Sequence, residues 1–216
     1  MINEHGDIPK IGERVEFASR FIPKAESLLD IGCGDGTLEY FIKNRISKIY
    51  GVDNAIKSVK ESKKYYFEIK LVDLNKTIPY KRNFFDVVTC LDVIEHIKDP
   101  NKLFKETYRV LKPNGLLLLS TPNIRFSDHI YKLLFQGIFP KTSTDNNSYD
   151  GGHIHFFTFT DIRNLLLANR FKIIEYRGII NKKERGWKGK IIEFLIGSKI
   201  MREFRSPGIL FIARKL

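Results

Sequence analysis

Short apolar runs alternate with segments of helical periodicity along the first half of this chain. The apolar runs predict strands at residues 27–31, 49–52, 67–72, 85–91 and 116–120. Apolar positions recur at helical spacing before and between these runs, which predicts helices at 11–22, 36–44, 54–64 and 99–111. Strands and helices that alternate in this way are typical of right-handed crossovers and a parallel sheet.

The hydrophobic pattern is looser beyond Thr121-Pro122-Asn123. It predicts a helix at 124–135, a polar stretch at 136–152, extended chain at 153–159, a helix at 161–169 capped by Thr160, and strands at 171–176 and 209–213. The last strand is expected at an edge of the sheet. The sequence therefore predicts an α/β fold, with a doubly wound, Rossmann-like, seven-stranded and mostly parallel sheet, an antiparallel C-terminal edge strand and three layers.

The whole chain of 216 residues is predicted to form one domain, since this length can bury a sizeable core. Residues 1–24 are expected to include a helix that caps the site. Residues 124–160 and 180–206 are expected to be insertions on the substrate side or accessory segments.

Acidic and glycine residues stand where the first four predicted strands end: Asp30 with Gly32, then Asp53, Asp73 and Asp92. Ligands of open α/β sheets bind outside the carboxyl ends of the strands. This placement predicts a binding site at that end of the sheet.

Three glycines, Gly32, Gly34 and Gly36, follow the first strand. A dinucleotide fingerprint would need its third glycine at Thr37, and no Walker lysine follows, so the loop is a poor phosphate site. Asp53 could accept hydrogen bonds from both hydroxyls of a ribose, each worth roughly 1.5–3 kcal/mol. These residues favour a nucleoside ligand over a phosphate-anchored one.

The run D-I-G-C-G-D-G at 30–36 resembles motif I of the class I S-adenosylmethionine-dependent methyltransferases. The resemblance continues through Asp73-Leu74, through F-D-V-V-T-C-L-D-V-I-E-H-I-K-D-P from Phe85, and through R-V-L-K-P-N-G-L-L-L-L-S-T-P-N from Arg109, covering about residues 25–180. This series is similar to the branch that includes ubiquinone-biosynthesis O-methyltransferases and methionine-biosynthesis W proteins. The segment from Asn123 through Gly137-Ile138-Phe139-Pro140 to His153-Ile154-His155 and Thr160-Asp161 resembles the W proteins more closely.

The resemblance implies S-adenosylmethionine as cofactor and a role for each matching residue. Asp53, followed by Asn54, would bind the ribose, Asp73 the adenine amino group, and the Leu74 backbone N–H the adenine ring. The sulfonium side would be lined by Leu91, Val93 and His96. The remaining cofactor-binding residues that it implies are Asp30, Gly32, Cys33, Gly34, Gly36 and Asp92.

Asp92, Glu95 and His96 would project on one face of a helical turn and could hold a hard divalent cation. Ubiquinone-type relatives carry an acid-x-x-Glu-His linked to magnesium, with Glu in place of Asp92, and cofactor packing or helix capping is the alternative role here. His153 and His155 alternate, so either could act as a general base, because imidazole titrates near neutral pH. Their alternative role is structural, with the ring bonded to backbone.

Charge and cysteine content narrow the compartment and the partners. The first residues, Met1 to Gly12, contain no secretory apolar segment, and two cysteines, Cys33 and Cys90, make no disulfide framework, so a cytoplasmic location is expected. The net charge of +12 includes eight Lys and Arg against three Glu at 182–205. An amphipathic basic helix predicted at 187–205 could contact an anionic membrane, pack on the sheet, close over a substrate or form a homodimer.

The function predicted is methyl transfer from S-adenosylmethionine to a small molecule, most simply to oxygen and directly from the sulfonium. One alternative is a non-catalytic or regulatory subunit, which the W-type resemblance implies would partner a homoserine acyltransferase. Another is an RNA methyltransferase, suggested by the pI of about 9.6. Against nucleic acids, and DNA in particular, Leu91-Asp92-Val93 lacks the Asn/Asp-Pro-Pro-aromatic signature used on base amino groups. An NAD-dependent oxidoreductase is disfavoured by the glycine spacing.

Overall fold

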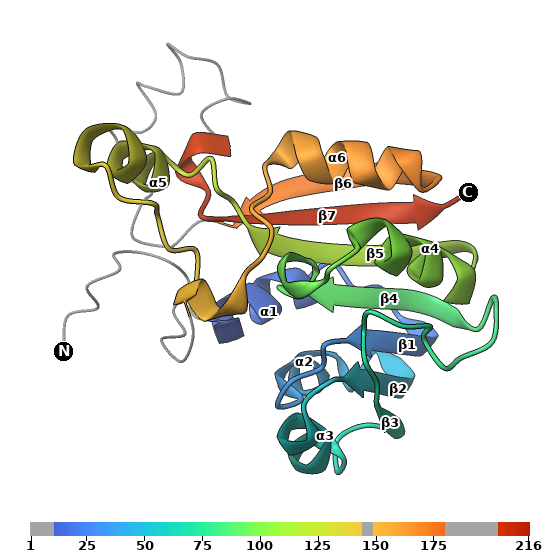
Figure 1. Ribbon diagram of the computed structural model, residues 1–216. Coiled ribbons are helices and arrows are strands. Elements are labelled where there is room, and N and C mark those ends of the chain that lie inside the picture. The colour runs from blue at the N-terminus through green and yellow to red at the C-terminus, as the bar shows by residue number, and fades with distance from the viewer. Residues whose placement is uncertain (1–10, 144–148, 180–202) are drawn as a thin grey trace.

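One sheet of seven strands, in the order β3-β2-β1-β4-β5-β7-β6, organises a computed structural model of the protein (Figure 1). The structure describes residues 11–143, 149–179 and 203–216. Its strands are β1 (Ala25–Ile31), β2 (Ile46–Asp53), β3 (Glu68–Leu71), β4 (Phe85–Leu91), β5 (Leu111–Pro122), β6 (Phe171–Ile179) and β7 (Gly208–Lys215). Its α-helices are α1 (Ile11–Ser19), α2 (Thr37–Ile42), α3 (Ile56–Ser62), α4 (Pro100–Val110), α5 (Ser127–Tyr131) and α6 (Phe159–Ala168). Shorter turns are η1 (Ile94–His96), η2 (Lys132–Gln136) and η3 (Tyr149–Gly152).

The strand directions confirm the predicted fold class. β1 runs parallel to β2 and β4, β2 to β3, and β4 to β5, whereas β7 is antiparallel to both of its neighbours, β5 and β6. The sheet is therefore mostly parallel, with a reversed C-terminal strand.

The predicted edge position of the last strand is wrong, because β7 lies between β5 and β6. Seven of the eight residues of β7 are buried, as an apolar run paired on both sides and covered on both faces should be. β6 forms the edge instead, and most of its residues are partly or fully exposed. The unbroken run Ile209–Ala213 was the signal for an interior strand.

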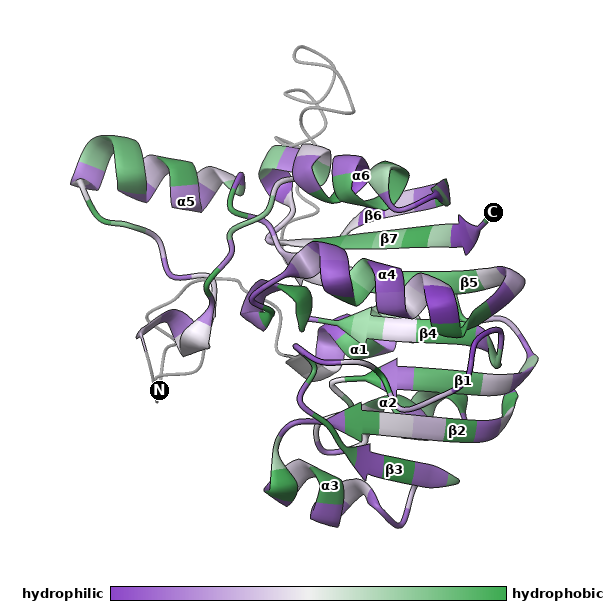
Figure 2. Ribbon diagram, turned by 45° about the vertical axis from the view of Figure 1, so that its right-hand side comes forward, coloured by the Kyte–Doolittle hydropathy of each residue, from purple (hydrophilic) through white to green (hydrophobic). Residues whose placement is uncertain are grey.

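Helices cover both faces of the sheet and make three layers. Leu103 and Phe104 of α4 pack with Ile162 of α6 on one face, while Leu38 and Ile42 of α2 pack on the other. Neighbouring strand residues alternate between these two cores, since Leu29 belongs to the first and Leu28 to the second. Figure 2 shows α4 and α6 in front of the sheet, α1 and α2 behind it, and hydrophobic residues along β4, β5 and β7.

Two of the less periodic predictions differ from the structure, and a third cannot be compared with it. The helix predicted at 124–135 is divided into α5 and the π-helical turn η2. The chain predicted as extended at 153–159 forms only an isolated bridge, between Asn123 and Phe157. Most of the helix predicted at 187–205, and residues 1–10, lie outside the described residues. No helix within the described part of the chain is long and apolar enough to cross a membrane.

Helix caps are well defined at the two long helices. Asp99, at the predicted start of this helix, caps α4 by accepting the Lys102 N–H at 3.2 Å, with Pro100 in the first turn. The cap of α6 is Thr158, so the prediction of Thr160 is wrong. Thr158 and Asp161 form a capping box, in which the side chain of each residue accepts a hydrogen bond from the backbone N–H of the other. This pairing requires a spacing of three residues.

Thr158→Ala should lower the free energy of unfolding by about 1 kcal/mol, because it leaves an N–H group at the start of α6 without its acceptor. Thr160→Ala, in the exposed first turn of the same helix, should change that free energy by less than about 0.5 kcal/mol. Urea unfolding of both variants measures the two effects. Equal destabilisation by the two substitutions would contradict the cap seen here.

Candidate functional site

A cleft opens at the carboxyl ends of β1, β2 and β4, where the strand order reverses direction between β1 and β4. Open α/β sheets bind ligands at this switch point. The cleft has a volume of about 300 Å³ and is lined by Gly32, Asp53, Asn54, Leu74, Asn75, Asp92, Val93, His96 and Ile97. Seven of these were predicted from the sequence, and Asn75 and Ile97 were not.

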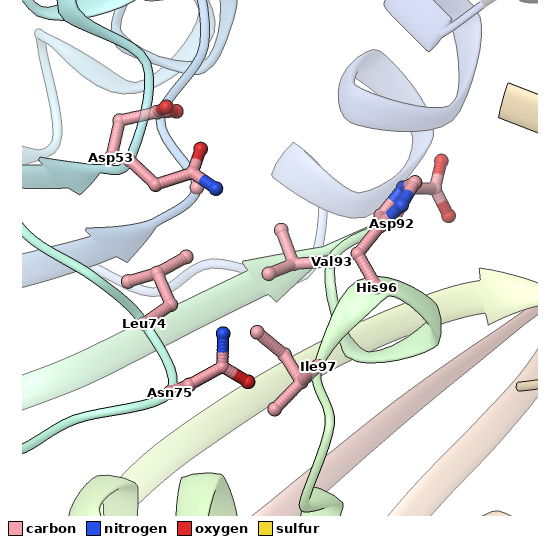
Figure 3. A pocket seen from close by; sticks show the side chains of 9 residues that line it. Asp53, Leu74, Asn75, Asp92, Val93, His96 and Ile97 are labelled. Carbon is pink, nitrogen blue, oxygen red and sulfur yellow. The ribbon is translucent and has the colours of Figure 1, made fainter. Parts of the chain in front are cut away.

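Two walls of the cleft face each other in Figure 3. Leu74 and Asn75, from the loop after β3, stand opposite Val93 and Ile97, from the turn that follows β4. Asp53 lies at the end of the first wall. Apolar side chains on both walls with a carboxylate at one end suit a flat aromatic ring attached to a polar group.

The glycine loop borders the cleft with backbone instead of side chains. Gly32 has φ +71°, and a Cβ there would come within 2.2 Å of Val93 Cγ2, so no other residue fits without rearrangement. Gly34 has φ +52° and open space where a Cβ would point. The loop thus lets a ligand come close to the main chain.

Asp53 is buried at the end of β2 and holds the glycine loop. Its Oδ2 accepts the Gly34 N–H at 2.9 Å, and its Oδ1 accepts the Ala55 N–H at 2.8 Å. Each carboxylate oxygen can accept a second hydrogen bond. With respect to the described residues, Asp53 therefore retains one acceptor site per oxygen for a pair of ligand hydroxyls.

Asp30 lies beneath the loop and does not line the cleft. Tyr66 Oη and Thr89 Oγ1 donate to its two oxygens at 2.7 and 2.8 Å. Burial, with a smaller contribution from the charge of Asp53, raises the pKa of Asp30 to about 6, against the opposing effect of the two hydrogen bonds. Asp30 thus supports the glycine loop from beneath.

The other residues predicted to bind the cofactor lie around the cleft without lining it: Cys33, Gly34, Gly36, Asp73 and Leu91. Burial raises the pKa of the Cys33 thiol well above its usual range, which leaves no reactive thiolate there. The Asp73 side chain is 48% exposed and accepts from the backbone N–H and side-chain Nδ2 of Asn75, and these bonds lower its pKa. Asn75 thus lines the cleft beside Leu74, at the place where Asp73 was expected to bind the adenine amino group.

Asp92 joins the cleft to the N-terminal helix. It has φ +54°, and its two oxygens accept from Ser120 Oγ and from an Arg14 guanidinium nitrogen, each at 3.0 Å. The Arg14–Asp92 pair is almost completely buried. The sequence predicted a helix around Arg14 but gave no signal for this ion pair, which depends on how α1 packs.

A second group of polar side chains, Glu95, His96 and His153, lies beside the cleft. One ligand atom from each lies within 4.8 Å of those of the other two. The sequence had grouped Asp92 with Glu95 and His96, but the structure gathers His153 in place of Asp92. His96 Nδ1 lies 3.2 Å from the Gly152 carbonyl oxygen, and the His96 and His153 rings meet edge to face at 4.7 Å.

Glu95 is 1% exposed, and burial, with the nearby charge of Asp92, raises its pKa to about 8. Its Oε2 accepts from Thr121 Oγ1 at 3.0 Å, but its Oε1 has no hydrogen-bond partner among the described residues and lies 3.9 Å from His153 Nε2. Burial and the neighbouring His96 lower the pKa of His153. Burial thus favours the neutral form of both side chains.

The two histidines predicted as general bases are separated in the structure. His153 joins Glu95 and His96, while the ring of His155 lies against Phe157, 5.6 Å away between centroids. The backbone N–H groups of Ile154 and His155 both donate to the Glu95 carbonyl oxygen, at 2.9 and 3.1 Å. The role of general base stays a prediction for both residues.

Comparisons with known proteins agree with this architecture. The model of a family described as "Methyltransferase domain" matches residues 4–176. A ubiquinone biosynthesis O-methyltransferase of Coxiella burnetii is 28% identical over 117 residues, which are 51% of this chain and 50% of that protein. The chain therefore spans about half the length of the curated relatives that it matches.

Solved structures share the fold at low sequence identity. A SAM-dependent methyltransferase from Methanosarcina mazei is 20% identical with a TM-score of 0.66, covering 93% of this chain and 97% of that one. The [4+2]-cyclase SpnF is 16% identical with a TM-score of 0.65, covering 94% and 80%. Since the second protein is named for a different reaction, the fold alone does not decide the chemistry.

The raised pKa of Asp30 predicts a pH-dependent contribution to stability. A carboxyl whose pKa rises from 3.8 to about 6 on folding stabilises the protein fully below pH 3.8 and loses that contribution as pH rises through 6. Asp30→Asn should therefore gain up to about 3 kcal/mol of unfolding free energy relative to wild type between pH 4 and pH 7. Denaturant unfolding at several pH values measures this difference, and a difference that does not vary with pH would contradict the assignment.

Proposed function

Because this chain belongs to the methyltransferase domain family, we propose that it binds S-adenosylmethionine in the cleft and transfers the methyl group to a small molecule. The observation that carries the proposal is Asp53, a buried carboxylate at the end of β2 with one free acceptor site on each oxygen. It stands at the end of a cleft whose walls suit an adenine ring.

The residues that line the cleft fit the ribose and the adenine of the cofactor. Asp53 would bind the ribose hydroxyls, and Leu74, Val93 and Ile97 would enclose the adenine, with Asn75 offering polar atoms beside it. Gly32, which lines the cleft with backbone alone, would lie against the remainder of the cofactor. When bound, the cofactor supplies a methyl group on a sulfonium, which is reactive enough to be attacked directly.

The work of the chain in such a reaction is alignment of the acceptor with the methyl group. His96 and Asp92 lie in the wall that the turn after β4 provides, beside the part of segment 124–160 that returns to η1. We propose oxygen as the acceptor atom, which the likeness to ubiquinone O-methyltransferases supports. The imidazole of His96, which lines the cleft, could also accept a hydrogen bond from a hydroxyl of the acceptor.

Incubation of the protein with S-adenosylmethionine and a panel of phenolic, sugar and carboxylic acceptors tests the proposal. Formation of S-adenosylhomocysteine together with a methylated product supports it. Tight cofactor binding with no turnover, together with co-purification of a homoserine acyltransferase, would instead support a regulatory subunit. No cofactor binding at all would remove both.

Asp53→Ala should weaken S-adenosylmethionine binding roughly ten- to a hundredfold, or about 1.4–2.8 kcal/mol, because the ribose loses its carboxylate partner. Isothermal titration calorimetry measures the dissociation constant. Glu175→Ala, on the edge strand far from the cleft, is the control and should leave it unchanged. An unaltered constant in Asp53→Ala would exclude Asp53 from binding the ribose.

A further inference from the structure

We propose that Glu95, His96 and His153 form a binding site for a divalent transition-metal ion such as Zn²⁺, with one open position. The site differs from the magnesium set of ubiquinone-type relatives, which would use Asp92 in place of His153. Binding of the ion does not depend on the proposed methyl transfer, because it can be measured without cofactor.

The arrangement of hydrogen bonds leaves His153 Nε2 without a proton. The Thr142 hydroxyl donates its only hydrogen to Asp150 Oδ2 at 2.8 Å, so it can only accept from His153 Nδ1, which lies 2.6 Å away. In neutral imidazole one nitrogen carries the proton and the other offers a lone pair. His153 therefore presents the lone pair of Nε2 toward Glu95.

Two acceptor atoms thus face each other inside the protein. Glu95 Oε1 is buried without a hydrogen-bond partner among the described residues, and it lies 3.9 Å from His153 Nε2. Burying these two atoms against each other is costly unless a proton or a metal ion satisfies them. Their separation of 3.9 Å is too long for a hydrogen bond between Glu95 and His153, whereas a metal ion can bind both atoms at once.

The third side chain is oriented in the same way. His96 Nδ1 lies 3.2 Å from the Gly152 carbonyl oxygen, which can only accept, so Nδ1 carries the proton and Nε2 keeps a lone pair. Metal-binding histidines are usually held by such a bond from their other ring nitrogen. Both imidazoles here have that support, His96 from Gly152 and His153 from Thr142.

The separations are close to those of a metal site. Zinc binds nitrogen and carboxylate oxygen at about 2.0–2.2 Å, so two ligand atoms on a tetrahedral ion lie roughly 3.4 Å apart. One ligand atom of each side chain lies within 4.8 Å of those of the other two, so side-chain rotations are needed to bring them to that spacing. The side chains of Glu95 and His153 lie in the interior, while His96 is exposed.

Both oxygens of Asp92 already accept hydrogen bonds from other side chains, which argues against a magnesium site made of Asp92, Glu95 and His96. Arg14 and Ser120 donate to its two oxygens, and the ion pair with Arg14 is buried. Magnesium also prefers oxygen ligands and keeps several waters, whereas two imidazoles with one carboxylate suit zinc, iron or manganese. The substitution of a nitrogen ligand for an oxygen ligand changes the metal class that the site selects.

Under the proposed function, such an ion would lie next to His96 at the rim of the cleft. Its open position could bind an oxygen of the acceptor, and a bound cation lowers the pKa of a hydroxyl attached to it. This role rests on the proposed function, but the binding of metal does not.

Calorimetric titration of Zn²⁺ into the full, tag-free chain, stripped of metal with a chelator and desalted, tests the site. We expect one ion per chain and at least tenfold weaker binding in His153→Ala and in Glu95→Gln. His155→Ala is the matched control, since this neighbouring histidine lies outside the cluster, and it should bind zinc as the wild type does. Asp92→Asn should change the zinc affinity less than threefold, and Mg²⁺ should bind far more weakly than Zn²⁺.

A second measurement guards against variants that fail to fold. Zinc should raise the melting temperature of the wild type and of His155→Ala but not that of His153→Ala. The visible spectrum of bound Co²⁺ should change when His153 is replaced, because the ligand set changes. No zinc binding by the wild type, equal loss in His153→Ala and His155→Ala, or loss in Asp92→Asn with retention in His153→Ala would overturn the proposal. Unchanged S-adenosylmethionine binding alongside such a result would leave the proposed function intact.

Discussion

The hydrogen bond from the Gly34 N–H to Asp53 Oδ2 ties together the two strands on which the cleft depends. It joins the loop after β1 to the end of β2, at 2.9 Å, and so fixes the glycine backbone against a carboxylate that lines the cleft. Asp30 supports the same loop from below through Tyr66 and Thr89. The two acids thus have different roles, because Asp53 lines the cleft whereas Asp30 lies beneath the loop, outside the lining of the cleft.

The other wall of the cleft depends on a backbone contact. The Glu95 carbonyl oxygen accepts the N–H groups of Ile154 and His155, which attaches a segment from much later in the chain to the turn after β4. α5, between these two parts of the chain, projects away from the sheet in both overall views (Figures 1 and 2). The return of the chain to η1 is what brings His153 beside Glu95, so the second polar group is a product of this attachment.

Much of the fold and part of the site follow from local sequence. The bounds of β4 were predicted correctly because Phe85–Leu91 is buried on both faces, and burial of that kind leaves an unbroken apolar run. Asp53 was found because polar residues gather at strand ends in a parallel sheet, whereas Leu74 and Val93 were implied by the resemblance to methyltransferase motifs. The contacts of Arg14 with Asp92 and of His153 with Glu95 could not be predicted from local sequence. In each pair the two residues are far apart in the chain and meet only when a helix or a loop has packed. Thr158 was missed for a simpler reason, as a threonine two residues later also preceded an apolar helix.

The interior position of β7 makes the order of synthesis matter to one half of the sheet. The five strands of the half that carries the cleft, β1 to β5, have all been translated once Pro122 has been added. Each of them pairs with another strand of that same stretch of chain. β6, by contrast, hydrogen-bonds within the described sheet to β7 alone, and it must wait for residues 208–215 to leave the ribosome. Until then α6 and β6 are held near the rest by contacts such as Phe171 against Phe104 and the hydrogen bond from the Asn169 side chain to Asn101 Oδ1. The half of the sheet that carries the cleft can therefore form during translation, whereas the far edge is added after it, through pairings of long sequence separation that close slowly.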